Sequence, residues 1–241
     1  MLTVSVAIRS LLTGILLLGF FYLIGQFILR LTAASKNAIA HSFFEAVTMG
    51  LLTALSCYAI VITGGKTLLL PVPFLLAIFL LTDKTKNDKV ILIANKTFLW
   101  FGILSFILFF IYYLQAHISL SSKSFRFAST DHSYYARLAS AINSYGIETP
   151  KLYFPGIDNY RPEPYHYIDI WTTAFISKIT GLNSHYSLSI VMYPVFASIF
   201  STGMFEAAVK RYGNSLTVQL ISLFTVFFSG IGFFFPTILL S

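Results

Sequence analysis

Long, nearly uncharged apolar stretches are the feature of this sequence that most restricts its fold. Five of them reach or approach the roughly 20 residues that a helix needs to cross about 30 Å of hydrocarbon. They are residues 11–31, 43–62, 97–114, 186–209 and 216–240. The 241-residue chain is 56% hydrophobic and only 10% charged, which leaves too few charges to cover the surface of a soluble domain. The sequence therefore predicts an all-α, polytopic transmembrane helix bundle, and it excludes a soluble fold and disorder.

A sixth apolar stretch, residues 67–81, is shorter and contains Pro71 and Pro73, which disfavour a helix interior. The charges of the loops favour including it, because Lys and Arg gather in short cytoplasmic loops. The basic residues after the first, third and fifth stretches are Arg30, Lys36, Lys84, Lys86, Lys89, Lys96, Lys210 and Arg211. These three loops share one side of the membrane if all six stretches span. We therefore predict about six helices in the plasma (inner) membrane, with the N-terminus and the long loop extracytoplasmic.

The same loop bias explains the formal net charge of +7, which in a soluble protein would suggest nucleic acid. The predicted partner is the lipid bilayer, with no nucleic acid. We expect three regions: residues 1–114 with four transmembrane helices, residues 115–185 as an extracytoplasmic loop, and residues 186–241 with two further helices. The chain ends inside an apolar stretch, so a complete protein and the N-terminal portion of a longer one both remain open, as does the oligomeric state.

Residues 115–185 carry five of the nine acidic residues and are rich in tyrosine, which favours a functional loop over a disordered one. A short helix is predicted from about Asp131 to Tyr145, with Ser129 or Thr130 as its N-cap and Gly146 at its end. Its apolar stripe comprises Tyr134, Leu138, Ala141, Ile142 and Tyr145. After a Gly- and Pro-rich stretch, a second helix is predicted from about Tyr165 to Ile179, ended by Gly181. Its apolar face comprises Ile168, Trp171, Thr172, Phe175, Ile176 and Ile179.

Two groups in this loop are candidates for chemistry. Asp131 falls in the first turn of its helix, where the macrodipole and the unpaired amide groups favour a charged carboxylate. A simple helix-start role explains it equally well. Arg161 with His166 supplies donors suited to a phosphate, although an aromatic belt at the membrane interface also explains this stretch.

Other chemistries find less support. The five histidines show no zinc-site spacing, and the chain has neither a P-loop nor a dinucleotide fingerprint. Glu45 and Glu206 lie near the ends of apolar stretches, where an interfacial anchor is a better interpretation than an intramembrane ion site.

The loop also resembles a known family. The run Thr130-Asp131-His132-Ser133-Tyr134-Tyr135-Ala136-Arg137-Leu138-Ala139 is followed by the Gly and Pro stretch, a Tyr-His-Tyr helix start, a Gly-Leu-Asn turn and a membrane helix. This order resembles the first extracytoplasmic region of GT-C superfamily glycosyltransferases, which include protein O-mannosyltransferase-like enzymes. The resemblance covers Phe125 to about Val209. It departs from the family where three additional apolar stretches precede the loop, and where His132 occupies the place of a frequent second acidic residue.

The resemblance implies transfer of a sugar from a polyprenyl-phosphate-linked donor to an acceptor on the extracytoplasmic face. Asp131 would be the general base on the acceptor hydroxyl, and Arg161 and His166 would bind the donor phosphate. The further candidates for binding donor or substrate are Arg137, Tyr135, Tyr165, His132 and Glu163. A divalent metal is compatible with this chemistry, and the residues leave metal dependence open. The competing hypotheses are a transporter or flippase subunit for a lipid-linked or small polar substrate, and a non-catalytic assembly protein.

Overall fold

The computed structural model of the chain describes residues 4–32, 42–64, 89–117, 130–148 and 167–226. Throughout these ranges the regular structure is helical, and no strand occurs in them. Four helical stretches are long and apolar enough to span a membrane: Val4–Leu29, Phe43–Gly64, Lys96–His117 and Ser184–Tyr212. The predicted all-α membrane bundle is therefore confirmed at this level. The apolar stretch at 67–81 lies outside the described residues, as does the part of the last stretch beyond Val226.

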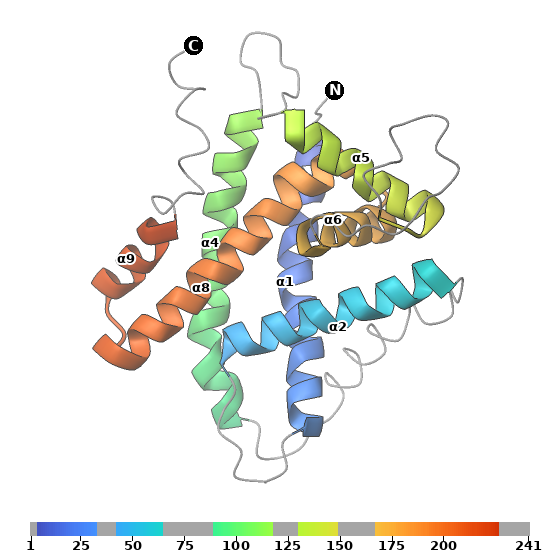
Figure 1. The fold of residues 1–241 in the computed structure, drawn as a ribbon. Coiled ribbons are helices and arrows are strands. Elements are labelled where there is room, and N and C mark those ends of the chain that lie inside the picture. The colour runs from blue at the N-terminus through green and yellow to red at the C-terminus, as the bar shows by residue number, and fades with distance from the viewer. Residues whose placement is uncertain (1–3, 33–41, 65–88, 118–129, 149–166, 227–241) are drawn as a thin grey trace.

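The first two helices, α1 (Val4–Thr32) and α2 (Phe43–Gly64), pack with their backbones in direct contact. A Cβ atom at Gly25 would overlap the carbonyl oxygen of Ala46, and one at Gly50 would overlap that of Phe21. Small residues permit this approach, which is how membrane helices gain packing energy where lipid provides no hydrophobic drive. Figure 1 shows α2 lying across α1 rather than along it.

A second group of helices consists of α4 (Lys89–His117), α8 (Tyr193–Tyr212) and α9 (Leu216–Val226). Aromatic rings join α4 to α8: Phe101 stacks on Phe205 with centroids 4.2 Å apart, and Tyr113 stacks on Tyr193 at 5.7 Å. In Figure 1, α8 crosses α4 diagonally and α9 folds back beside α8. Offset ring pairs of this kind fix the register of two helices as well as burying area.

The membrane helix that ends in α8 begins with two unusual pieces, α7 (Ser184–Tyr186) and the π-helix η3 (Ser187–Met192). The Tyr193 backbone N–H donates to the carbonyl of Leu188, five residues back. Pro194 follows, and a proline ring collides with the carbonyl four residues before it in an ordinary α-helix. A wider turn relieves that collision, and single π-turns are frequent at functional sites.

Two shorter helices, α5 (Thr130–Tyr145) and α6 (Tyr167–Thr180), occupy the ranges in which the sequence predicts short helices. Each ends as predicted at a glycine in the left-handed region, Gly146 with φ 73° and Gly181 with φ 66°. The start of α1, the end of α4 and the start of α5 lie at the same end of the bundle (Figure 1).

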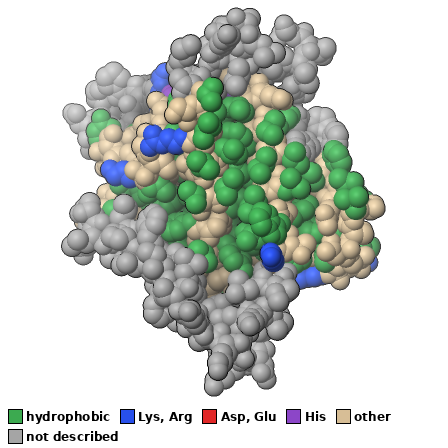
Figure 2. Space-filling model, turned by 180° about the vertical axis from the view of Figure 1, so that it is seen from behind, with side chains coloured by type: hydrophobic (Ala, Val, Ile, Leu, Met, Phe, Trp, Pro, Cys, Tyr) green, Lys and Arg blue, Asp and Glu red, His purple; other side chains and the backbone are tan. Residues whose placement is uncertain are grey.

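The buried sides of these two helices are wider than the predicted apolar faces. Most residues of those faces are buried, whereas Tyr145 is 69% exposed and Ile168 49% exposed. The buried residues of α5 and α6 are Ala136, Leu138, Ala139, Ile142 and the whole run from Ile170 to Ile176. The cause is that small and polar residues also face the protein where other helices come close. Seen from behind the view of Figure 1, the molecule has a broad area covered by apolar side chains (Figure 2), as a surface facing lipid requires.

Candidate functional site

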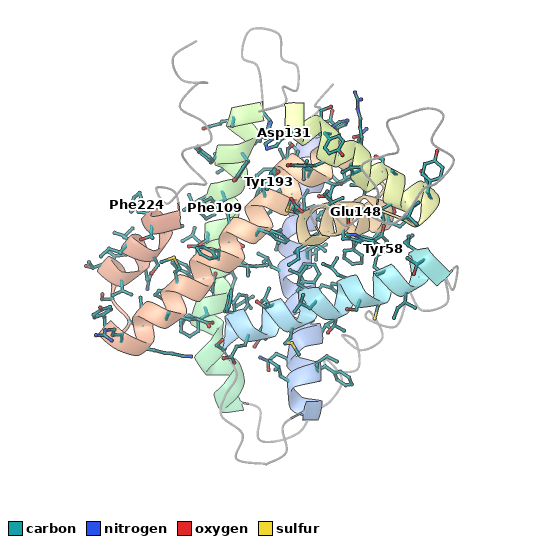
Figure 3. The ribbon with its side chains drawn as sticks, viewed as in Figure 1. Tyr58, Phe109, Asp131, Glu148, Tyr193 and Phe224 are labelled. Atoms are coloured by element: carbon teal, nitrogen blue, oxygen red, sulfur yellow. The ribbon has the colours of Figure 1, made fainter. Side chains whose placement is uncertain are left out.

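Asp131 lies in the first turn of α5, at the end of the bundle where α1 begins, and it is exposed. Figure 3 shows it above Tyr193, the residue at the junction of η3 and α8. The unpaired amide groups and the dipole of the α5 N-terminus favour a negative charge at this position. The carboxylate predicted as the general base is therefore accessible from solvent.

Tyr193 lies close to the other polar groups of the candidate site. Its phenol lies within electrostatic range of the Asp169 and Asp131 carboxylates and of the Tyr135 hydroxyl. Tyr135 follows Asp131 by four residues, so the two side chains share one face of α5. We call Asp131, His132, Tyr135, Asp169 and Tyr193 the carboxylate cluster. It brings together three residues of the predicted site, Asp131, His132 and Tyr135, with two for which the sequence predicted no role.

Asp169 is the second carboxylate, and its place in α6 matches that of Asp131 in α5. It is half-buried in the first turn of α6, and its Oδ1 accepts from the backbone N–H of Ile170 at 2.9 Å. The N-terminal ends of two helices therefore each hold a carboxylate near Tyr193, and each supplies a favourable dipole. This arrangement offers several oxygen acceptors and aromatic rings to a hydroxyl-bearing ligand.

Within the cluster, His132 lies next to His117 of α4. The His132 ring lies 5.1 Å from that of Tyr193 and 5.8 Å from that of His117, the last residue of α4. Burial and the neighbouring His117 lower the pKa of the His132 imidazole to about 4, against a smaller opposing effect of Asp131. His132 is therefore neutral at pH 7. It can exchange hydrogen bonds with a substrate, but it adds no positive charge for a phosphate.

The remaining predicted site residues are not in this cluster. Arg137 is exposed two positions beyond Tyr135, and it lies within electrostatic range of His185. Two positions along a helix turn the side chain by about 200°, so Arg137 faces away from Tyr135. The other four, Arg161, Glu163, Tyr165 and His166, lie outside the described residues.

Hydrogen bonds between helices hold the ends of α5 and α6 in place. The Trp171 indole N–H donates to Glu148 Oε2 at 2.7 Å, and both side chains are buried. The Tyr58 hydroxyl of α2 donates to Asn143 Oδ1 at 2.7 Å, and Asn143 Nδ2 donates to the carbonyl of Ala174 at 3.0 Å. Glu148 and Tyr58 lie near the α2, α5 and α6 junction in Figure 3. These buried or partly buried bonds join three helices, and breaking one would leave a polar group without its partner.

The two membrane carboxylates considered from the sequence both serve the start of α2. Glu45 Oε2 accepts from the Ser42 backbone N–H at 3.1 Å, and Ser42 Oγ accepts from the Glu45 N–H at 3.0 Å, which is a capping box. Glu206 is buried in α8, and its Oε1 accepts from the Phe44 backbone N–H at 3.1 Å. Glu206 thus joins α8 to the N-terminus of α2, a role the sequence did not suggest.

Within the described ranges, no three His, Cys, Asp or Glu side chains converge in a way that could hold a metal ion. No role was predicted from the sequence for His117, Asp169 or Tyr193. For Asp169 the sequence signal was weaker than for Asp131, since the second helix is predicted from about Tyr165, which places Asp169 after its first turn. Tyr193 offered none, because its position depends on the π-turn.

Comparison with known proteins gives no indication of function, so a proposed function must be argued from the fold and the carboxylate cluster. The chain matches no model of a known protein family, and no curated protein and no solved structure is significantly similar to it.

Proposed function

We propose that this protein is an integral membrane glycosyltransferase of the GT-C type. It would transfer a sugar from a polyprenyl-phosphate-linked donor to an acceptor on the extracytoplasmic face. The observation that carries the proposal is the exposed Asp131 carboxylate at the head of α5, within electrostatic range of Tyr193, which is also in range of Tyr135 and of a second carboxylate, Asp169. A lipid-linked donor also suits a protein with four helices able to span a bilayer.

In this proposal Asp131 accepts the proton of the acceptor hydroxyl while that oxygen attacks the anomeric carbon of the sugar. The bond from that carbon to the phosphate oxygen breaks, and the lipid phosphate leaves with the electron pair. Arg161 and His166 would stabilise the leaving phosphate, and Tyr165 and Glu163 would contact hydroxyls of the sugar or the acceptor. Arg137, which faces away from Tyr135, has no part in this step. Within the cluster, neutral His132 and the hydroxyls of Tyr135 and Tyr193 would orient sugar hydroxyls.

The proposal includes an orientation with six spanning helices and with the N-terminus and the α5–α6 region outside the plasma membrane. Support comes from the bundle, where α1 begins at the end that carries α5 (Figure 1). The basic residues Lys210 and Arg211 end α8, as expected for the cytoplasmic side.

Cysteine labelling tests this orientation. In a Cys57→Ala background, exposed Ser144→Cys on α5 should react with an impermeant thiol reagent added to intact cells. Exposed Asn214→Cys, between α8 and α9, should react only after the membrane is permeabilised. The reverse pattern would overturn the orientation and the extracytoplasmic site with it.

The catalytic assignment is tested by Asp131→Asn, which keeps the volume and the helix-capping ability but loses proton acceptance. Sugar transfer from a polyprenyl-phosphate donor should fall by roughly 100-fold or more. Glu45→Gln is the matched control, because Glu45 is also an exposed carboxylate in the first turn of a helix. Transfer should hardly change in that variant. Near-normal transfer by Asp131→Asn would eliminate the proposed general base.

One observation favours the competing transporter hypothesis. The hydroxyls of Ser187 and Ser189 are buried in η3 and have no hydrogen-bond partner within the described residues. Irregular helix and polar groups inside a bundle are typical of substrate sites in transporters. Uptake or flipping of a lipid-linked sugar that persists in Asp131→Asn but is lost in Ser189→Val would support that alternative.

A further inference from the structure

Arg9 is a charged residue on α1, a helix with one side buried in the bundle and the other exposed. It is the only charged residue between Val4 and Leu29, and it is exposed. It lies about 7 Å along the helix axis from Val4, the first described residue of α1. At that depth a long side chain reaches the interface between headgroups and hydrocarbon.

A hydrogen bond fixes the position of its guanidinium. Nη2 of Arg9 donates to the carbonyl of Thr180, the last residue of α6. Capping a helix C-terminus accounts for one of the five N–H donors of an arginine. Within the described part of the chain no carboxylate forms an ion pair with Arg9. The guanidinium is therefore held in place with donors still available to an anion.

An apolar stripe starts beside Arg9 and follows α1 toward the middle of the bundle. Its members are four residues apart and lie on one face of the helix: Val4 is 77% exposed, Ile8 53%, Leu12 54% and Leu16 71%. The stripe is about 18 Å long, since a helix rises about 1.5 Å per residue. One leaflet contributes roughly 15 Å of hydrocarbon, so the stripe matches the acyl chains of a single leaflet.

We propose that Arg9 and the α1 stripe of Ile8, Leu12 and Leu16 bind an anionic phospholipid. The lipid phosphate accepts hydrogen bonds from the Arg9 guanidinium, and the acyl chains lie along the stripe. A guanidinium recognises phosphate through paired N–H donors, and its anchoring to Thr180 reduces the entropy lost on binding. The inference does not depend on glycosyl transfer.

Fluorescence quenching by brominated lipids measures this directly. The reporter protein carries Trp100→Phe, which removes the exposed tryptophan, and Leu12→Trp, which places one in the stripe; Trp171 stays buried. The protein is reconstituted in phosphatidylcholine vesicles that contain either dibrominated phosphatidylglycerol or dibrominated phosphatidylcholine. At low salt the anionic lipid should associate with the tryptophan introduced in the stripe about three- to fivefold more strongly than the neutral one.

Arg9→Gln should reduce this preference to about one, and Arg9→Lys should retain part of it because the charge remains while the fork is lost. The matched control reporter is Leu104→Trp in the Trp100→Phe background, on the exposed face of α4. This control tryptophan should be quenched equally by the anionic and the neutral lipid, both in the protein with Arg9 and in the Arg9→Gln variant. Equal quenching by both lipids in the Leu12→Trp reporter, or a preference that survives Arg9→Gln, would overturn the proposal. Absence of quenching by either lipid would also overturn it, because another protein surface would then cover the stripe.

Discussion

The helices α5 and α6 differ in their surroundings although their sequences predict the same kind of element. Both are short, at 16 and 14 residues, both carry an aspartate in the first turn, and both end at a glycine with positive φ. Yet α5 keeps Asp131, Arg137 and Tyr145 exposed, whereas α6 is buried on every side from Ile170 to Ile176. The periodicity of apolar residues therefore identifies a helix without showing how many of its faces other helices cover.

The reason lies in what packs against each helix. Phe175 of α6 lies against Phe20 and Phe21 of α1 and Tyr58 of α2, with centroids 6.5, 6.4 and 5.6 Å away. The helix α5 covers α6 from the other side, and the Asn143 amide donates to the Ala174 carbonyl. As a result, α6 is part of the core while α5 presents the polar face on which the proposed chemistry depends.

The largest expected difference between α5 and α6 is in the unfolding free energy lost when an aromatic side chain is removed from each. Phe175→Ala should lower the free energy of unfolding by about 3–5 kcal/mol, because the cavity it leaves lies among packed rings. Tyr145→Ala on α5 removes a side chain that is 69% exposed and should change it by less than about 0.5 kcal/mol. Denaturation of the purified protein in mixed micelles, followed by circular dichroism, measures both. Similar costs would mean that α6 is not a core helix.

A smaller difference is expected in the stability cost of replacing the glycine that ends each helix. Gly181→Ala should cost about 1–2 kcal/mol, because alanine is strained at positive φ. Gly146→Ala should cost roughly 1–3 kcal/mol more, because its Cβ would also lie 2.7 Å from the carbonyl oxygen of Ile62 in α2. The same denaturation assay applies. Gly181→Ala is itself the control, since the nearest atom to its new Cβ is Nη2 of Arg9 at 3.7 Å, an ordinary contact. Equal costs at the two glycines would refute the close contact between α5 and α2.

The smallest effect at neutral pH concerns His132, on the inner side of α5. Its pKa of about 4 in the folded protein is below its ordinary value of 6.5. As the pH falls below about 6.5, the unfolded chain takes up this proton first, so His132 makes stability decrease until the pH reaches about 4. Unfolding free energies of the wild type and His132→Gln at pH 7, 6 and 5 should therefore diverge, with the variant losing less. A wild type that gained stability relative to the variant on acidification would show a charged, stabilised imidazole instead.

Much of the fold and part of the site could be predicted from the sequence. Membrane helices have a strong signal because every backbone polar group must be bonded within the helix, so spans such as Phe43–Gly64 appear as unbroken apolar runs. The glycine ends of α5 and α6 and the location of Asp131 at a helix start follow from local backbone preferences. The shared proximity of Asp131 and Asp169 to Tyr193 could not be predicted, because it involves three separate helices.

What the sequence alone determined is local: which segments are apolar enough to span a membrane, where short helices stop, and that an aspartate begins α5. The tertiary structure decided which of these pieces meet. It placed Glu206 at the start of α2, buried α6 among the aromatic rings of α1 and α2, and used the π-turn before Pro194 to set Tyr193 beside two carboxylates. Such contacts depend on how closely helices approach and how they are rotated. Those quantities come from the packing of the whole bundle, because residues far apart in the chain must fit the same space.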